Sequence, residues 1–277
     1  LAEGGASVTG ELLDNDVADG AEITTFTYTA EDGATRSADA GETVDTQYGS
    51  LTVNADGSYT YVSDASEDHS AGTLSESFTY TLSNGVESDT ASATIQVTDG
   101  VPTAVDDATV SVEEGAAAVT GDVMDNDVEG PDGATLTSFD YTDANGAAQT
   151  AQAGATVTTQ NGSLTVNGDG TWSFTPADSV DNSNGPVQGT LSYTITDSDG
   201  DSATAEMPIE ITDGGGPIAV DDGPDAGDGG ATVAEGENQI TGNVIENDDA
   251  GSDGPITVVS FTYTAEDGSS QTANAGD

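Results

Sequence analysis

The chain has 277 residues, and its 52 Asp and Glu residues stand against one basic residue, Arg36, which gives a formal net charge of −51 at pH 7. Phosphate binding depends on Lys and Arg contacts, so this composition excludes a nucleic-acid partner and disfavours anionic membrane surfaces. No apolar run approaches the about 20 residues that a spanning helix needs, and residues 1–20 do not read as a signal peptide. We therefore expect no membrane insertion, and an export signal outside this segment if the protein is secreted.

The charge also sets a condition on folding. Like charges at this density repel over a Debye length of about 8 Å at physiological salt, so the folded chain needs cations. The sequence contains no Cys for disulfides and no Lys for isopeptide crosslinks. Metal ions remain as the available crosslink.

The predicted elements recur along the chain. The pair Thr9-Gly10 returns as Thr120-Gly121 and Thr241-Gly242, at intervals of about 110 to 120 residues. A strand, an Asp-Gly turn and an aromatic strand follow in each of the first two copies, over residues 49–61 and 162–174. We predict repeat 1 over residues 1–100 without its first strand, a complete repeat 2 over 101–214, and the N-terminal half of repeat 3 over 215–277.

Repeat 2 shows the strand pattern most fully. Alternating segments predict strands near 108–112, 117–124, 135–142, 147–152, 156–160, 162–167, 171–175, 189–196 and 202–212, and no segment has helical periodicity. The fold class is therefore all-β, with tandem immunoglobulin- or cadherin-like antiparallel sandwiches in an elongated array. The expected core of repeat 2 consists of Val119, Val123, Leu136, Phe139, Tyr141, Val157, Leu164, Val166, Trp172, Phe174, Leu191, Tyr193, Ile195, Ile209 and Ile211.

Acidic turns are the candidate metal sites, because Ca²⁺ takes about six to eight hard oxygen ligands. The first kind is an Asp-Asn-Asp loop after a short apolar strand, at Asp14, Asn15, Asp16 and Asp19, at Asp125, Asn126, Asp127 and Asp132, and at Asn247, Asp248, Asp249 and Asp253. The second kind flanks the Pro-containing linkers, at Asp99, Asp106 and Asp107 and at Asp213, Asp221 and Asp222. The third is the loop of Asp197, Asp199 and Asp201. The competing interpretation is that these are ordinary turn residues, since Asp and Asn favour turns.

The sequence gives little indication of a catalytic site. His69 is the one histidine and is expected to be an exposed loop residue. Carboxylate pairs are too abundant to indicate a glycosidase site, and Trp172 is expected in the core rather than on a sugar-stacking surface. We predict no enzyme activity and no cofactor besides Ca²⁺.

Several motifs in a fixed order point to a family. The joint Ala104-Val105-Asp106-Asp107, then Glu113-Glu114-Gly115, residues 120–127 and the closing residues 193–201 resemble the VCBS and bacterial cadherin-like repeats of giant RTX-type adhesins. This resemblance implies calcium-stiffened sandwiches at the bacterial cell surface, exported by a type I system. Repeat 1 has Leu82-Ser83-Asn84-Gly85-Val86 in place of the acidic loop that repeat 2 has at 197–201. We therefore expect the loop at 82–86 to be free of metal.

Two functions remain open from the sequence. The first is a calcium-stabilised stalk that acts as a stiff spacer in a surface adhesin, whose partners are the neighbouring repeats of the same chain. The alternative is a structural subunit of a surface layer, sheath or extracellular filament, in which copies of the chain pack or pair strands. A carbohydrate-binding module is a third reading, but no solvent-facing aromatic residue beside a calcium loop stands out.

Overall fold

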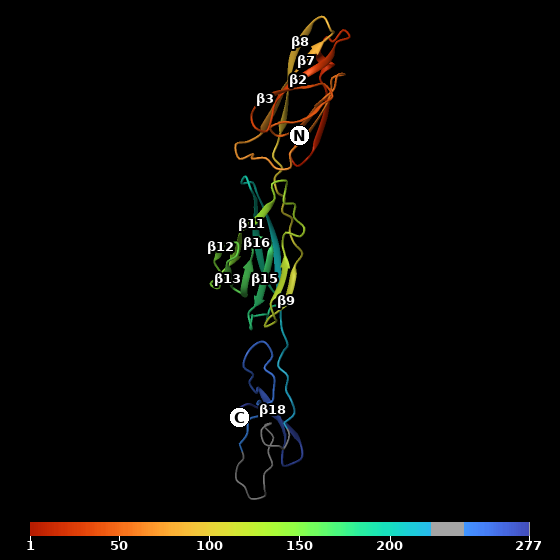
Figure 1. Cartoon of the computed structure of the whole chain (residues 1–277). Coiled ribbons are helices and arrows are strands. Elements are labelled where there is room, and N and C mark those ends of the chain that lie inside the picture. The colour runs from red at the N-terminus through yellow and green to blue at the C-terminus, as the bar shows by residue number, and fades with distance from the viewer. Residues whose placement is uncertain (223–240, 277) are drawn as a thin grey trace.

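The computed structural model describes residues 1–222 and 241–276. Strands dominate this part of the chain, and its three repeats follow one another end to end in an elongated row (Figure 1). Only one short 3₁₀ turn, η1 (Leu13–Asn15), interrupts the strands of the described ranges. Within those ranges, no helix has the length and apolar character to span a membrane.

Repeat 1 is a sandwich of two four-stranded antiparallel sheets. The strands of one sheet, in spatial order, are β1 (Ser7–Glu11), β6 (Ser58–Ser63), β5 (Gly49–Val53) and β4 (Thr43–Asp45). Those of the other are β3 (Thr35–Asp39), β2 (Glu22–Thr29), β7 (Leu74–Ser83) and β8 (Ser88–Val97).

Repeat 2 has the same arrangement with one more strand. Its smaller sheet contains β10 (Val119–Asp122), β15 (Thr171–Pro176), β14 (Gly162–Val166) and β13 (Thr156–Thr159). Its larger sheet contains β12 (Ala148–Gln152), β11 (Ala134–Thr142), β16 (Val187–Asp197), β17 (Ser202–Thr212) and β9 (Val110–Glu113), with β9 parallel to β17. The all-β sandwich prediction is confirmed.

The start of repeat 1 corresponds to the end of β9. Ala2 forms a parallel bridge to Thr98 after β8, as Glu113 pairs with Thr212 at the last rung of β9 and β17. Repeat 1 therefore has one rung where repeat 2 has a four-residue strand.

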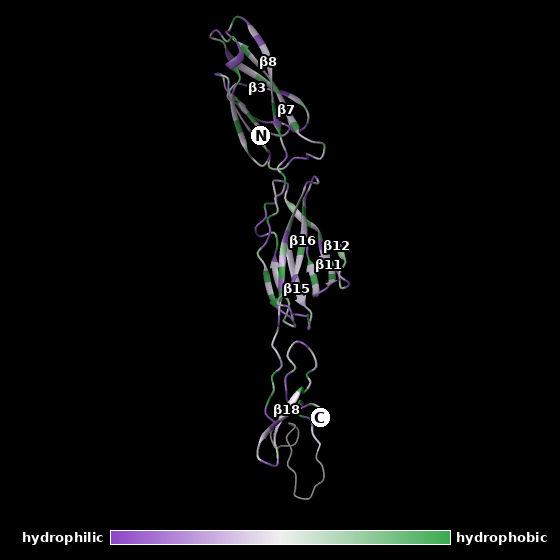
Figure 2. Ribbon diagram, turned by 180° about the vertical axis from the view of Figure 1, so that it is seen from behind, coloured by the Kyte–Doolittle hydropathy of each residue, from purple (hydrophilic) through white to green (hydrophobic). Residues whose placement is uncertain are grey.

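Alternation along the strands builds a separate core in each sandwich (Figure 2). Twelve of the fifteen residues expected in the core of repeat 2 are buried, and Val119, Tyr141 and Val157 are partly buried against it. The repeated Thr-Gly pair also has a packing role. A Cβ at Gly10 would lie 2.6 Å from the Tyr59 ring, and one at Gly121 would lie 2.9 Å from the Trp172 ring. Glycine therefore lets an aromatic ring of the neighbouring strand lie across β1 and β10.

In the part of repeat 3 that the structure describes, β18 (Ser260–Thr264) and β19 (Ser270–Asn274) form a two-stranded sheet. Phe261 on β18 is 45% exposed, whereas its counterparts Phe26 on β2 and Phe139 on β11 are buried. The difference follows from the second sheet, which covers Phe26 and Phe139 in the first two repeats and has no counterpart in the described part of repeat 3.

Candidate metal centre at the joints between repeats

The joint between repeats 1 and 2 gathers carboxylates from both sides. Asp99 follows β8 of repeat 1, and the β16–β17 turn of repeat 2 carries Asp197, Asp199 and Asp201. One carboxylate oxygen from each of these four residues lies within 4.8 Å of the others, and we call this group the joint 1–2 cluster. The structure thus brings together residues that the sequence placed in two separate candidate sites.

The turn itself positions Asp197. Its Oδ1 accepts hydrogen bonds from the backbone N–H groups of Gly200 (3.0 Å) and Asp201 (2.7 Å), so one oxygen holds the turn in shape. The side chain is only 9% exposed, and Oδ2 is buried with no hydrogen-bond partner. Oxygens of Asp99 and Asp199 are buried and unpartnered as well. Buried carboxylate oxygens without partners are costly, and a bound cation would satisfy them.

His69 connects the two repeats at this joint. Its backbone N–H donates to Asp199 Oδ2 at 3.0 Å, and its ring nitrogens lie 3.1 Å from Glu67 O and 3.2 Å from Val97 O. The residue is 5% exposed, so the expectation of an exposed loop histidine is wrong. The loop that carries His69 folds under the end of repeat 1 and is closed by a turn of repeat 2, a contact that repeat 1 alone could not indicate. Burial opposes protonation of the ring, but the two carbonyls, Glu3 and Asp99 outweigh it and raise the pKa of His69.

Glu3 is a buried carboxylate at the same joint and was not among the predicted ligands. Its Oε1 accepts from Gly100 N–H (3.2 Å) and its Oε2 from Glu67 N–H (2.8 Å). Glu3, His69 and Asp99 form a second group of potential ligands with atoms within 4.8 Å. Asp132 of repeat 2 adds a further carboxylate, and burial together with the neighbouring Glu3 raises the pKa of Asp132 to about 6.

The joint between repeats 2 and 3 repeats this arrangement. Glu114, Asp213 and Asp253 have oxygens within 4.8 Å, in the places that Glu3, Asp99 and Asp132 hold at the first joint. Glu114 accepts from Gly214 N–H (3.3 Å) and Val180 N–H (2.5 Å). The negative charge of Glu114 is the main cause that raises the pKa of the exposed Asp253 carboxyl. The recurrence of Glu3-Gly4 as Glu114-Gly115 was the sequence signal for these two glutamates.

Each joint has a glycine at a point where the two repeats approach closely. A Cβ on Gly100 would lie 2.7 Å from Pro131 of the next repeat, and one on Gly214 would lie 2.6 Å from Ser252. These distances are below normal carbon contacts, so the Thr-Asp-Gly ending of each repeat allows the next repeat to approach closely.

The Asp-Asn-Asp loops act within their own repeats. Asp127 Oδ1 accepts from Val105 N–H (2.8 Å) and Asn126 Nδ2 donates to Val105 O (2.9 Å), so the loop clamps the linker. The hydroxyl of Tyr193 also donates to Asp127, at 3.1 Å. Asp248 holds Val220 N–H at 2.7 Å in the equivalent place of repeat 3. In both repeats, side chains of this loop therefore hold the linker that leads into the repeat.

The remaining predicted ligands lie apart from the joint clusters. Asp106 Oδ1 accepts from Glu206 N–H (3.0 Å), and Asp107 is a neighbour of Asp127 rather than of Asp99. Burial raises the pKa of Asp107 to about 6, and the nearby Tyr193 hydroxyl partly offsets this effect. Asp16 accepts from the Tyr80 hydroxyl at 2.7 Å. Exposed positions are held by Asp14, Asn15, Asp19, Asp125, Asp221, Asp222 and Asp249, while Asn247 is partly buried.

The part of the chain with a complete sandwich matches a known family. Residues 99–210 match the family profile of the bacterial Ig domain. No curated protein matches the sequence.

Several solved structures are similar over most of the chain. The mouse clustered protocadherin PcdhgC3 EC1-3 is 14% identical over 77% of this chain and 65% of its own, with a TM-score of 0.27. A chimeric titin Z1Z2 tandem is 16% identical over 76% and 93%, with a TM-score of 0.26. The endo-fucoidan hydrolase MfFcnA4 is 18% identical over 77% and 27%, with a TM-score of 0.24. The match thus spans about two thirds of the protocadherin chain and about a quarter of the hydrolase. Repeat 2 is therefore similar to bacterial Ig domains, within a chain of tandem all-β sandwiches.

Proposed function

We propose that this chain is a calcium-stabilised extender of a bacterial cell-surface adhesin, in which Ig-like sandwiches joined end to end act as a stiff spacer. The observation that carries the proposal is the joint 1–2 cluster, whose four carboxylates come from two different repeats. A cation bound there would connect the repeats directly. The buried and unpartnered Oδ2 of Asp197 gives that cation a place.

The ligand atoms fit calcium better than a transition metal. The cluster offers carboxylate oxygens alone, which are the ligands of hard cations such as Ca²⁺. The imidazole of His69 lies nearby, but both of its ring nitrogens face backbone carbonyls. Asp99, Asp197, Asp199 and Asp201 are the residues that would hold the ion, with Glu3 and Asp132 next to them.

Ion binding at the joints would set the stiffness of the row. In linear arrays stability is a sum of repeat terms and neighbour terms, so a ligand at a joint acts on the neighbour term. An ion that binds only the folded form adds about 1.4 kcal/mol per site at ten times its Kd. Extracellular calcium modules have Kd values of roughly 10⁻⁴ to 10⁻³ M, which makes the joint soft at low calcium and stiff outside the cell.

The location and export route that we propose rest on the resemblance to adhesin repeats. We place the protein outside the cell, exported by a type I system, with the neighbouring repeats as its partners. A spacer needs no catalytic group, and we propose no enzyme activity. Lateral assembly of copies into a surface layer or filament is the alternative outcome of the test below.

Thermal unfolding of the full chain with millimolar calcium and with EGTA tests this function. We expect calcium to raise the unfolding midpoint of repeats 1 and 2, and Asp99→Asn to remove most of that increase. Asp125→Asn, an exposed acid outside the cluster, should leave the increase unchanged. Equal midpoints with and without calcium would overturn the proposal, and ordered polymers in electron micrographs would favour the filament subunit.

A further inference from the structure

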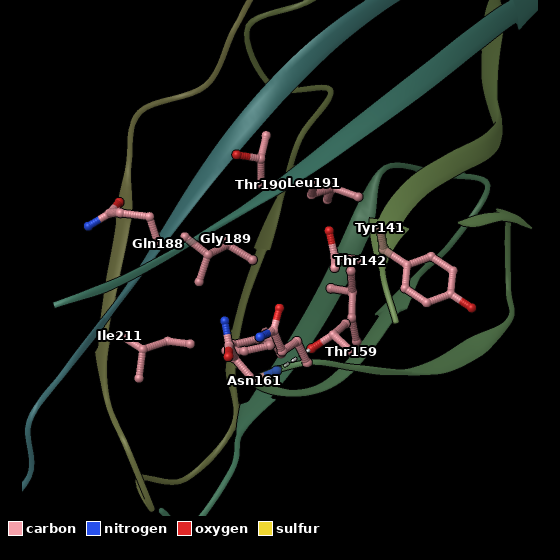
Figure 3. A pocket seen from close by; sticks show the side chains of 13 residues that line it. Tyr141, Thr142, Thr159, Asn161, Gln188, Gly189, Thr190, Leu191 and Ile211 are labelled. Carbon is pink, nitrogen blue, oxygen red and sulfur yellow. Dashed lines mark hydrogen bonds between the residues drawn. The ribbon is translucent and has the colours of Figure 1, made fainter. Parts of the chain in front are cut away.

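Repeat 2 contains a cavity of about 80 Å³ where its two sheets part (Figure 3). Leu164, Phe174 and Leu191, all buried, form its apolar floor. Thr159 and Asn161, in and after β13, lie on one side, and Gly189 and Thr190 of β16 lie across from them (Figure 3). None of the lining residues is charged, in a chain with a net charge of −51.

The cavity exists because β16 has glycine where repeat 1 has a long side chain. Gly189 pairs with Ile209, and Glu76 on β7 pairs with Ile95 in the equivalent register. Glu76 is only 2% exposed, and its carboxyl lies beside Thr46 and Tyr48, the counterparts of Thr159 and Asn161. A Cβ on Gly189 would meet only Ile209 O, at 3.9 Å. The cavity of repeat 2 is therefore the space that a glutamate side chain fills in repeat 1.

The turn beside the cavity is hydrogen-bonded differently in the two repeats. In repeat 1 the Thr46 side chain and the backbone N–H groups of Tyr48 and Gln47 lie near the Glu76 carboxyl and partly offset the effect of burial on its pKa, while Glu76 Oε2 is buried without a hydrogen-bond partner. In repeat 2 the N–H of Gln160 donates to Thr142 O (3.1 Å) and that of Asn161 to Thr159 Oγ1 (3.2 Å). The backbone N–H groups of Gln160 and Asn161 at the rim of the cavity are thus already hydrogen-bonded within the repeat. The side chains of this rim carry hydroxyl and amide groups rather than charges.

We infer that this cavity binds a short aliphatic stem ending in a carboxamide, the group that a glutamine side chain of a partner polypeptide carries. The stem would lie on the apolar floor, and the amide would both donate to and accept from the Thr, Asn and Gln side chains of the rim. Glutamine has the length of Glu76, which occupies the same space in repeat 1.

Size and charge set the chemical class. Water takes about 30 Å³ per molecule, so the cavity has room for a few heavy atoms and not for a whole ligand. A carboxylate would enter a site that offers no counter-charge, which is unfavourable. Consistent with this, burial raises the pKa of the Glu76 carboxyl in repeat 1, so the equivalent space favours an uncharged group.

Propionamide, the side-chain analogue of glutamine, is the probe, titrated into the ¹⁵N-labelled full chain. We expect saturable amide shifts at Gly189, Leu191 and Asn161, and at least tenfold weaker binding of propionate at neutral pH. Gly189→Gln places the same group in the cavity from within and should abolish the shifts while raising the unfolding midpoint of repeat 2. Ser192→Gln, on the opposite face of β16, should leave binding unchanged.

Three results would overturn the inference. One is the absence of a saturable shift at these residues. Another is undiminished propionamide binding in a folded Gly189→Gln variant. The third is tighter saturation of the same residues by N-acetylglucosamine, which would assign the cavity to the acetamido group of an amino sugar instead of a glutamine side chain.

Discussion

At the scale of single residues, a comparison of equivalent positions near the two joints shows which side-chain hydrogen bonds recur. His69 of repeat 1 and Asn182 of repeat 2 occupy the same place, since His69 Nε2 lies 3.2 Å from Val97 O and Asn182 Nδ2 donates to Ile211 O at 2.9 Å. Each side chain satisfies the carbonyl at the end of the last strand of its sandwich. A hydrogen-bond donor to this carbonyl is therefore common to both repeats, whereas the 3.5 Å contact of His69 Nδ1 with Glu3 Oε2 has no equivalent at Asn182.

Substitution of His69 tests the need for a donor to this carbonyl. We expect His69→Asn to change the free energy of unfolding of repeat 1 by less than about 0.5 kcal/mol, because Asn182 already makes this contact in repeat 2. His69→Leu leaves the buried Val97 carbonyl without a donor and should cost about 1–3 kcal/mol. Urea unfolding in EGTA measures both variants. An unchanged stability of His69→Leu would show that these hydrogen bonds do not contribute.

Glu76 gives a pH prediction of defined sign. Burial raises the pKa of the Glu76 carboxyl in the folded state. Its contribution to the free energy of unfolding is therefore most favourable in acid and is lost as the pH rises through the folded-state pKa. Glu76→Gln mimics the protonated form. The variant should match the wild type at about pH 4 and exceed it by on the order of 1 kcal/mol at about pH 7.5.

Denaturant unfolding in EGTA at both pH values checks this, with the exposed Glu31→Gln as the control. A stability gain for Glu76→Gln of the same size at both pH values would contradict the assignment of the effect to ionisation.

The residue scale also shows what the sequence could predict of the site. Asp99, Asp197, Asp199 and Asp201 were recognisable as oxygen donors, but their meeting depends on how two repeats abut, which local sequence does not encode. Glu3 was missed because a single Glu before Gly resembles an ordinary turn.

At the scale of elements, the alternation of apolar and polar residues predicted the positions of the strands closely, but it did not predict the β-bulge. The expected strand near 202–212 is β17 (Ser202–Thr212), and the one near 162–167 is β14 (Gly162–Val166). The bulge between Leu136 and Ser138 on β11 was not predicted, although it shifts the alternation by one residue and leaves the buried Leu136 and Phe139 three residues apart. Strand existence thus follows from the period of two, while register follows from tertiary pairing.

The acidic β16–β17 turn of repeat 2 differs in composition from the equivalent β7–β8 turn of repeat 1. Ser83 pairs with Ser88 at the base of the β7–β8 turn, and Thr196 pairs with Ser202 at the base of the β16–β17 turn. Residues 84–87 can therefore replace residues 197–201 without a change of register. We expect this chimera to keep the sandwich of repeat 2 and to lose the calcium-dependent rise in stability at joint 1–2.

Amide NMR spectra and calorimetric calcium titrations read the two effects separately. The role assigned to the acidic turn would be untenable if the folded chimera bound calcium at joint 1–2 as tightly as the original chain.

At the scale of the whole molecule, the charge and the joints belong to one account. The chain bears a net charge of −51, yet it places six carboxylates, those of Glu3, Asp99, Asp132, Asp197, Asp199 and Asp201, around the first joint, where repeats 1 and 2 meet end to end (Figure 1). Repulsion there opposes the elongated arrangement unless a cation offsets it. The direct contacts across this joint include the hydrogen bond from His69 N–H to Asp199 and the close approach of Pro131 to Gly100.

The most direct measurement is the distance distribution between spin labels on either side of joint 1–2. The chain contains no cysteine, so Ala34→Cys in repeat 1 and Ala148→Cys in repeat 2 give two exposed attachment points. The account predicts one narrow distribution with millimolar calcium, and a broad one in EGTA and in the Asp99→Asn variant. A distribution that is equally narrow in calcium and in EGTA would contradict it.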